Sequence, residues 1–454
     1  MSPEASSSPS PAGTRRTPLE SWIAAKIGHP GERPTPEILQ AYQVAALNET
    51  LRLAHENSRF YRRLLGPRPP ALHSLDELGR LPFTTAGDLR AAPLEWLCVR
   101  QDEVERIVTL PTSGTTGPPK RIYFTVADQE LTRDFFHHGM STLVSPGDRV
   151  LILLPGGLPG SVGDLLKDGL ERMNVAGIPH GPVADPRETM AVIRREAVTA
   201  LVGIPVQVLA LARTALRDPG GVPPTIHSVL LSTDRVPGVV AGVIESVFGC
   251  AVYNHYGTTE MGLGGGVDCV KRRGYHLREA DLLFEVVDPA TGLPVPEGAY
   301  GEVVFSTLTR RAMPFIRYRT GDRSRFVPEP CPCGTVLRRL AHVDERLGTE
   351  VVLPSGETVR QRDLDEVLFA VDGLLDFRAI LAREGEKATL TIEVKGIDGA
   401  PEAAVIENAL LTIPQLEREA GRARLLLHVQ GWQPGDGYGT GTQKRQIVQQ
   451  GGTE

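Results

Sequence analysis

The sequence predicts an α/β protein with a large N-terminal domain of mixed β-sheets and flanking helices, followed by a small α+β C-terminal domain. Three observations support this prediction. Short β-rich segments alternate with helical segments between residues 106 and 245, which is typical of βαβ units in a mostly parallel sheet. Residues 282–326 are then mainly strand-like. After residue 346, strand-like segments again alternate with helical ones.

The N-terminal half begins with a helical pattern, because apolar residues between positions 35 and 65 recur at helical spacing. Strands and helices then alternate along the chain. The expected strands cover residues 106–110, 121–125, 150–154, 199–204, 228–232 and 251–253, and the expected helices cover residues 163–173, 206–215 and 237–248.

The C-terminal half begins with a hairpin signal, since a Pro- and Gly-containing turn at residues 288–292 interrupts the strand-like segment. Beyond residue 346 we expect two short β-rich segments, helices at 364–370 and 403–410, and strands at 377–382 and 388–394. The predicted domains are therefore 18–345 and 346–454. Residues 1–17 are rich in Ser and Pro without the apolar segment of a signal peptide, so a disordered tail is expected.

Composition argues against several classes of function. The 454 residues carry a net charge of −6 and no Lys/Arg-rich block, so no nucleic-acid partner is expected. Apolar stretches such as residues 150–154 are far shorter than the ~20 residues that span a bilayer, so no membrane partner is expected. Five cysteines, an odd number, argue against a disulfide framework and favour a cytoplasmic location.

The segment from Thr112 to Lys120 predicts a phosphate-binding loop between two expected strands. Its hydroxyl side chains alternate with glycines, which allow a backbone N–H to approach an anion closely, and Lys120 adds a positive charge. The pattern is not the Walker type, in which Gly-Lys-Ser/Thr begins a helix. Taken alone, it also fits a surface turn. The candidate phosphate-binding residues are Thr112, Ser113, Gly114, Thr115, Thr116, Gly117 and Lys120.

Two further motifs, at residues 256–260 (YGTTE) and 318–322 (YRTGD), lie far along the chain from this loop. The three segments together resemble the central motifs of the adenylate-forming superfamily, which includes acyl-coenzyme A synthetases, peptide-synthetase adenylation domains and luciferases. A narrower resemblance, to the phenylacetate–coenzyme A ligase family, rests on residues 57–63, 74–85 and 308–314 and covers roughly residues 35–450.

The resemblance implies an ATP- and Mg²⁺-dependent enzyme that converts a small, aromatic carboxylic acid into an acyl adenylate and pyrophosphate. The acyl group would then pass to coenzyme A or an amine, and the C-terminal domain would be a mobile lid. The loop would wrap the phosphates, Tyr256 would stack on adenine and Thr259 would contact the α-phosphate. Glu260 would hold Mg²⁺, and Asp322 would accept both ribose hydroxyls. The other expected nucleotide contacts are Thr233, Gly257, Thr258 and the hinge arginine, Arg346.

Some positions depart from the family pattern. Gly348 and Thr349 stand where the family usually carries an acidic pair, and Thr442 stands in place of its catalytic lysine. Lys444 follows two residues later. Either Lys444 takes this role, with Thr259 and Glu260 as the other catalytic residues, or the adenylation step differs from that of the family.

A second group of residues predicts a structural zinc site. Cys331 and Cys333 form a Cys-x-Cys turn, and Cys269 and His276 lie earlier in the chain. Four nitrogen and sulfur ligands suit a closed tetrahedral zinc site, and some members of the family resemble this arrangement. The alternative is that the cysteines are simply buried in the core.

Other functions remain open at this level. One alternative is an adenylating enzyme that activates nitrite to diazotise an aryl amine, and another is a nucleotide-binding protein that has lost catalysis. Family members are often homodimers, but the sequence shows no interface. His255 could contact the reacting group or merely cap a strand, and the identity of the acid is not readable.

Overall fold

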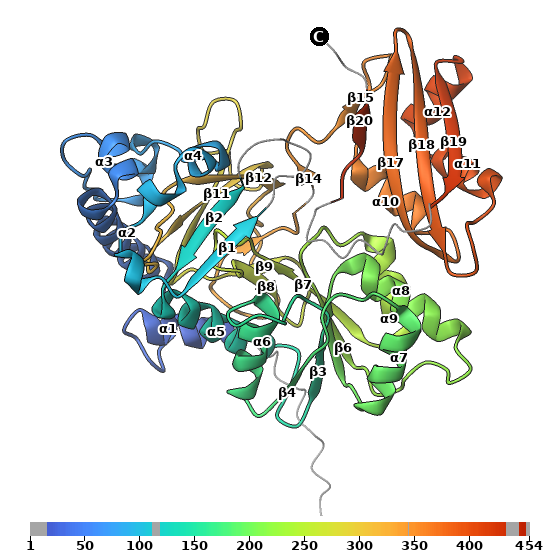
Figure 1. Ribbon diagram of the computed structural model, residues 1–454. Coiled ribbons are helices and arrows are strands. Elements are labelled where there is room, and N and C mark those ends of the chain that lie inside the picture. Colours follow the sequence, from blue (N-terminus) through green and yellow to red (C-terminus); the bar gives the residue numbers. More distant parts are fainter. Residues whose placement is uncertain (1–15, 111–118, 344, 433–444, 451–454) are drawn as a thin grey trace, which may run out of the picture.

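The computed structural model describes residues 16–110, 119–343, 345–432 and 445–450, and it confirms the predicted α/β class (Figure 1). A large N-terminal part contains several sheets, and a small α+β part follows it (Figure 1). The helices are α1 (Pro18–Lys26), α2 (Pro36–Asn57), α3 (Arg59–Leu65), α4 (Ala86–Ala91), α5 (Val126–Met140), α6 (Val162–Glu171), α7 (Pro186–Arg195), α8 (Pro205–Arg217), α9 (Gly238–Phe248), α10 (Gln361–Leu368), α11 (Ala403–Leu410) and α12 (Pro414–Gly421), with short 3₁₀ helices at Leu75–Arg80, Pro93–Trp96 and Gln101–Glu103.

The strands fall into five sheets, of two, four, eight, two and four strands. They are β1 (Arg106–Leu110), β2 (Lys120–Phe124), β3 (Arg149–Ile152), β4 (Ala176–Pro179), β5 (Ala200–Gly203), β6 (Ser228–Leu231), β7 (Ala251–Tyr256), β8 (Gly266–Asp268), β9 (Tyr275–Leu277), β10 (Leu282–Val287), β11 (Gly301–Thr307), β12 (Tyr318–Ser324), β13 (Arg339–Leu340), β14 (Glu345–Arg346), β15 (Val351–Val352), β16 (Thr358–Val359), β17 (Leu374–Glu384), β18 (Lys387–Gly396), β19 (Leu425–Gly431) and β20 (Val448–Gln450).

The largest sheet has the strand order β13-β9-β8-β7-β6-β5-β3-β4. Strands β3 to β7 run parallel, as the alternation of strands and helices predicts, and β7, β8, β9 and β13 pair antiparallel. Successive side chains of a strand point to opposite faces. Accordingly, Val150 and Ile152 pack with α5 and α6, whereas Leu151 packs with α7, α8 and α9 on the other face.

The second large sheet, β10-β11-β12-β14, is antiparallel and packs with α2 and α3 in its own hydrophobic cluster. The predicted hairpin turn connects β10 and β11, and within it Gly292 donates its backbone N–H to the carbonyl oxygen of Asp288 at 2.8 Å. Strand β12 carries Asp322, and its partner β14 carries Arg346. This sheet therefore brings two predicted nucleotide-binding residues together.

The C-terminal part has a four-stranded sheet, β19-β18-β17-β20, with α10, α11 and α12 (Figure 1). Its core is continuous with that of α8 and α9 in a single hydrophobic cluster. The predicted domain boundary between residues 345 and 346 lies within β14, and it stays a prediction. Among the described helices, none is long and apolar enough to cross a membrane.

Candidate functional site

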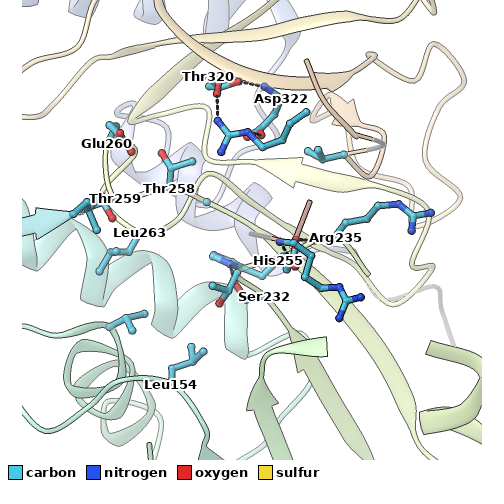
Figure 2. A pocket seen from close by; sticks show the side chains of 18 of the residues that line it. Leu154, Ser232, Arg235, His255, Thr258, Thr259, Glu260, Leu263, Thr320 and Asp322 are labelled. Carbon is cyan, nitrogen blue, oxygen red and sulfur yellow. Dashed lines mark hydrogen bonds and ion pairs between the residues drawn. The ribbon is translucent and has the colours of Figure 1, made fainter. Parts of the chain in front are cut away.

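A cavity of about 640 Å³ lies between the carboxyl ends of the parallel strands, β12 and the first residues of the C-terminal part. Parallel α/β sheets bind their ligands at this edge. Eight predicted site residues line the cavity: Lys120, Thr233, Gly257, Thr258, Thr259, Glu260, Asp322 and Arg346. Figure 2 shows Glu260, Thr320 and Asp322 on one side of the view and Leu154 on the other. The cavity therefore has a polar end and an apolar end.

Glu260 is a buried carboxylate at the polar end and is only 3% exposed. Its Oε1 lies 2.5 Å from Lys120 Nζ and accepts a hydrogen bond from the hydroxyl of Tyr318 at 3.1 Å. Burial favours the neutral acid, but the charge and hydrogen bond of Lys120 outweigh it, so the pKa of Glu260 is lowered. The group is therefore a carboxylate at neutral pH, as a ligand for a hard cation must be.

Arg310 holds the backbone at Glu260. Its Nη1 donates to the carbonyl oxygen of Glu260 at 2.7 Å, and its Nη2 donates to that of Tyr123 at 3.1 Å. The guanidinium lies over the rings of Phe124 and Phe315. The burial of this cation lowers the pKa of Arg310 to about 10. Strand β2 and the turn that carries Glu260 are thus tied together through one buried side chain.

Asp322 is fully buried in β12, and residues of two other strands, β7 and β14, contact its carboxylate. Tyr256 donates its hydroxyl to Asp322 Oδ2 at 3.1 Å, and Arg346 Nε lies 3.4 Å from Oδ1. Arg346 also donates to the carbonyl oxygen of Thr320 at 2.9 Å. Tyr256 itself is 6% exposed and stacks on Tyr275, so it lies beneath the surface of the cavity and does not line it.

The residues Thr258 and Thr259 project from a tight turn that follows β7. The backbone N–H groups of Met261 and Leu263 donate to the carbonyl oxygen of Thr258 at 3.1 and 2.9 Å. Gly257 makes this turn possible, because a Cβ at that position would lie 2.7 Å from the carbonyl oxygen of Leu263. The turn is thus folded back so tightly that position 257 has no space for a side chain.

Gly257→Ala is therefore expected to destabilise the protein by about 1–3 kcal/mol and to lower activity, because the clash is with backbone. The control is Gly242→Ala in helix α9, where a Cβ meets nothing within 4 Å. There we expect a gain of about 0.5–1 kcal/mol from helix propensity. Urea denaturation of both variants measures the difference, and a Gly257→Ala variant as stable as the wild type would contradict the close packing of Gly257 against the Leu263 backbone.

The apolar end of the cavity is lined by side chains from α5, α6 and the parallel strands, including Phe135, Phe136, Met140, Leu154, Leu166 and Val202. His255 and Ser232 also line it, and Ser232 Oγ lies 2.8 Å from His255 Nδ1. Desolvation in these surroundings lowers the pKa of His255 to about 4. The imidazole is therefore neutral at physiological pH.

Several lining residues are not among the predicted site residues: Arg90, Ser232, Arg235, Tyr318, Thr349, Arg360, Arg445 and Gln446. Arg445 comes from the end of the chain, and its guanidinium pairs with Asp365 at 3.2 Å and with Asp376. Its backbone N–H donates to Asp234 at 3.3 Å. The residues Thr112, Ser113, Gly114, Thr115, Thr116, Gly117 and Lys444 lie outside the described part of the chain.

The four predicted zinc ligands also come together, and none of them lines the cavity. The ligand atoms of Cys269, His276, Cys331 and Cys333 all lie within 4.8 Å of one another, and all four residues are buried. The Sγ atoms of Cys269 and Cys331 are 3.7 Å apart, and Cys333 Sγ is 3.6 Å from His276 Nε2. None of these cysteines forms a disulfide.

Comparison with known proteins relates the whole arrangement to enzymes. The family model described as AMP-binding enzyme matches residues 90–309. The chain is 31% identical over 378 residues to phenylacetate–coenzyme A ligase of Thermus thermophilus, covering 79% of this chain and 82% of that protein. It is 28% identical to the Escherichia coli enzyme of the same name, and the aligned region covers 81% of this chain and 84% of that enzyme.

Solved structures of 2-hydroxyisobutyryl-CoA ligase share the fold. The complex with 2-HIB-AMP in the postadenylation state has a TM-score of 0.75 at 21% identity, with 91% of this chain and 89% of that chain covered. The complex in the thioesterification state has a TM-score of 0.65 at 23% identity, with 92% of this chain and 90% of that chain covered.

Proposed function

The chain belongs to the phenylacetate–coenzyme A ligase family of AMP-binding enzymes, and we propose that its substrate is a small aromatic carboxylic acid. It is an AMP-forming ligase. A carboxylate oxygen attacks the α-phosphorus of ATP, pyrophosphate leaves, and the acyl adenylate transfers its acyl group to coenzyme A. These relatives favour this reaction over activation of nitrite and over a protein without catalysis.

The observation that carries the proposal is the convergence of Lys120, Glu260 and Asp322, which are 62 to 202 positions apart in sequence numbering, on a cavity with an apolar end. Asp322 and Arg346 would bind the ribose, because a carboxylate accepts from both hydroxyls of a cis-diol. Thr258 and Thr259 would contact the α-phosphate. The apolar end would hold the body of the acid, so that its carboxylate meets the α-phosphorus.

Mg²⁺ fits the polar end, because Glu260 supplies a buried, ionised oxygen ligand. The ion would offset the charge of the triphosphate. The ammonium group of Lys120 forms an ion pair with Oε1 of Glu260 and would help to offset the negative charge of the phosphates. Tyr318 fixes the orientation of the carboxylate through its hydroxyl.

Zinc fits the cysteine and histidine cluster, and we assign it a structural role. Zn–S bonds of about 2.3 Å in a tetrahedron put two sulfurs about 3.8 Å apart, close to the 3.7 Å between Cys269 and Cys331. The four residues connect the loop before β13 to β8 and β9. The metal would therefore hold this edge of the large sheet in place.

Pyrophosphate release from MgATP tests the proposed function directly. The purified protein is offered a panel of aryl and aryl-acetic acids and, separately, nitrite with aryl amines. Release that depends on an aryl acid, followed by thioester formation with coenzyme A, is the expected result. Release with nitrite alone, or ATP binding without release on any substrate, would contradict the proposal. The expected cytoplasmic location and homodimer stay predictions, as does the mobile lid.

A further inference from the structure

The apolar end of the cavity contains a polar pair, Ser232 and His255, contributed by neighbouring parallel strands. The register of β6 and β7 pairs Leu231 with Asn254, so the next residue on each strand is a member of this pair. Ser232 Oγ and His255 Nδ1 are 2.8 Å apart. In the view of Figure 2, the pair lies between Leu154 below and Thr258 above.

The contact with Ser232 uses one of the two ring nitrogens of His255. Nε2 is buried and has no hydrogen-bond partner among the described residues. The rings of Phe135 and Phe136 flank the imidazole, with centroids 6.1 and 6.2 Å away. A neutral imidazole has one N–H donor and one acceptor nitrogen, so Nε2 keeps one hydrogen-bonding capacity unused in apolar surroundings.

An unused polar atom at such a place discriminates between ligands. Nε2 is closed to water and unpaired in the free protein, so a polar ligand group that pairs with it gains a hydrogen bond that an apolar ligand leaves unmade. A hydroxyl on the ligand both donates and accepts, so it pairs with either tautomer, and an amino group pairs with the tautomer in which Nε2 accepts.

We propose that the acid carries a hydroxyl or amino group on its apolar body and that His255, held by Ser232, binds this group through Nε2. The inference rests on the proposed function, because it places the body of the acid at the apolar end. His255 is then the residue that determines substrate specificity, and Ser232 is a positioning residue that fixes the imidazole.

The test compares acids that differ in one substituent. For an aryl acid and an aryl-acetic acid, kcat/KM for pyrophosphate release is measured with hydrogen, methyl, hydroxyl or amino at each ring position. The methyl compound matches the size of the polar ones. At one ring position we expect the hydroxyl or amino compound to exceed the methyl compound by about 10-fold or more. Whichever of the hydroxyl and amino compounds has the higher kcat/KM then identifies the group that the acid carries.

Variants separate recognition from a general loss of structure, because the readout is the ratio between two acids. His255→Leu is expected to remove the preference, His255→Gln to restore part of it and Ser232→Ala to weaken it. His137→Leu is the matched control, because it makes the same change on helix α5, does not line the cavity and should keep the ratio. A methyl compound that equals or exceeds the polar ones at every position would overturn the inference while the proposed function stands. Failure of every acid to release pyrophosphate would contradict the proposed function itself.

Discussion

Glu260→Gln is expected to lower the rate of acid-dependent pyrophosphate release by about 10²- to 10³-fold. The side chain keeps its shape, but the amide loses the negative charge that a hard cation requires. Lys120, 2.5 Å away, would also lose its anionic partner in a buried place. Rates measured across a series of Mg²⁺ concentrations would show whether excess metal restores part of the activity, as expected for a metal ligand.

The control for this prediction is Glu95→Gln, which changes a carboxylate that pairs with Arg63 and does not line the cavity. We expect wild-type rates from it. A Glu260→Gln enzyme that turned over at the wild-type rate, at every Mg²⁺ concentration, would remove Glu260 from the proposed catalytic residues.

Cys333→Ser has the second large expected effect. Purified wild-type protein is expected to contain one zinc per chain, and the variant none. Because a structural zinc site contributes folding free energy directly, we expect a loss of roughly 3 kcal/mol or more. Elemental analysis and thermal unfolding of the same samples measure the two quantities.

Cys250→Ser is the matched control, because Cys250 is a free cysteine outside the cluster. It should keep its zinc and lose little stability. Wild-type protein that is free of metal and as stable as zinc-loaded protein would rule out the structural zinc site.

The sequence predicted the parallel strands well, because buried strands such as β3 and β6 are continuous apolar runs with a clear length. It did not predict β4, which lies at the edge of the sheet. The four residues of this strand, Ala-Gly-Ile-Pro, form neither a continuous apolar run nor an alternation of apolar and polar residues. Helix α7 was also missed, although Asp185 before Pro186 is a recognisable helix start. Charged and polar residues make up half of this helix, so the few apolar residues of its buried face give only a weak helical signal.

The candidate site was predicted where local motifs carry the chemistry, as for Glu260 and Asp322. Ser232 and His255 show why the rest was harder to predict. The two residues are 23 positions apart, and their contact depends on the register of two parallel strands. The contact of Arg310 with the carbonyl oxygen of Glu260 likewise has no sequence signature, because any buried backbone oxygen can accept such a bond.

In the adenylation step, a carboxylate oxygen of the acid attacks the α-phosphorus of ATP. The most direct measurement is the fate of ¹⁸O in the carboxylate of an acid that supports turnover with coenzyme A. We expect one labelled oxygen in AMP, because the bridging oxygen of the acyl adenylate leaves with AMP when the thiol attacks the carbonyl carbon. Unlabelled AMP, or label in pyrophosphate or orthophosphate, would contradict it.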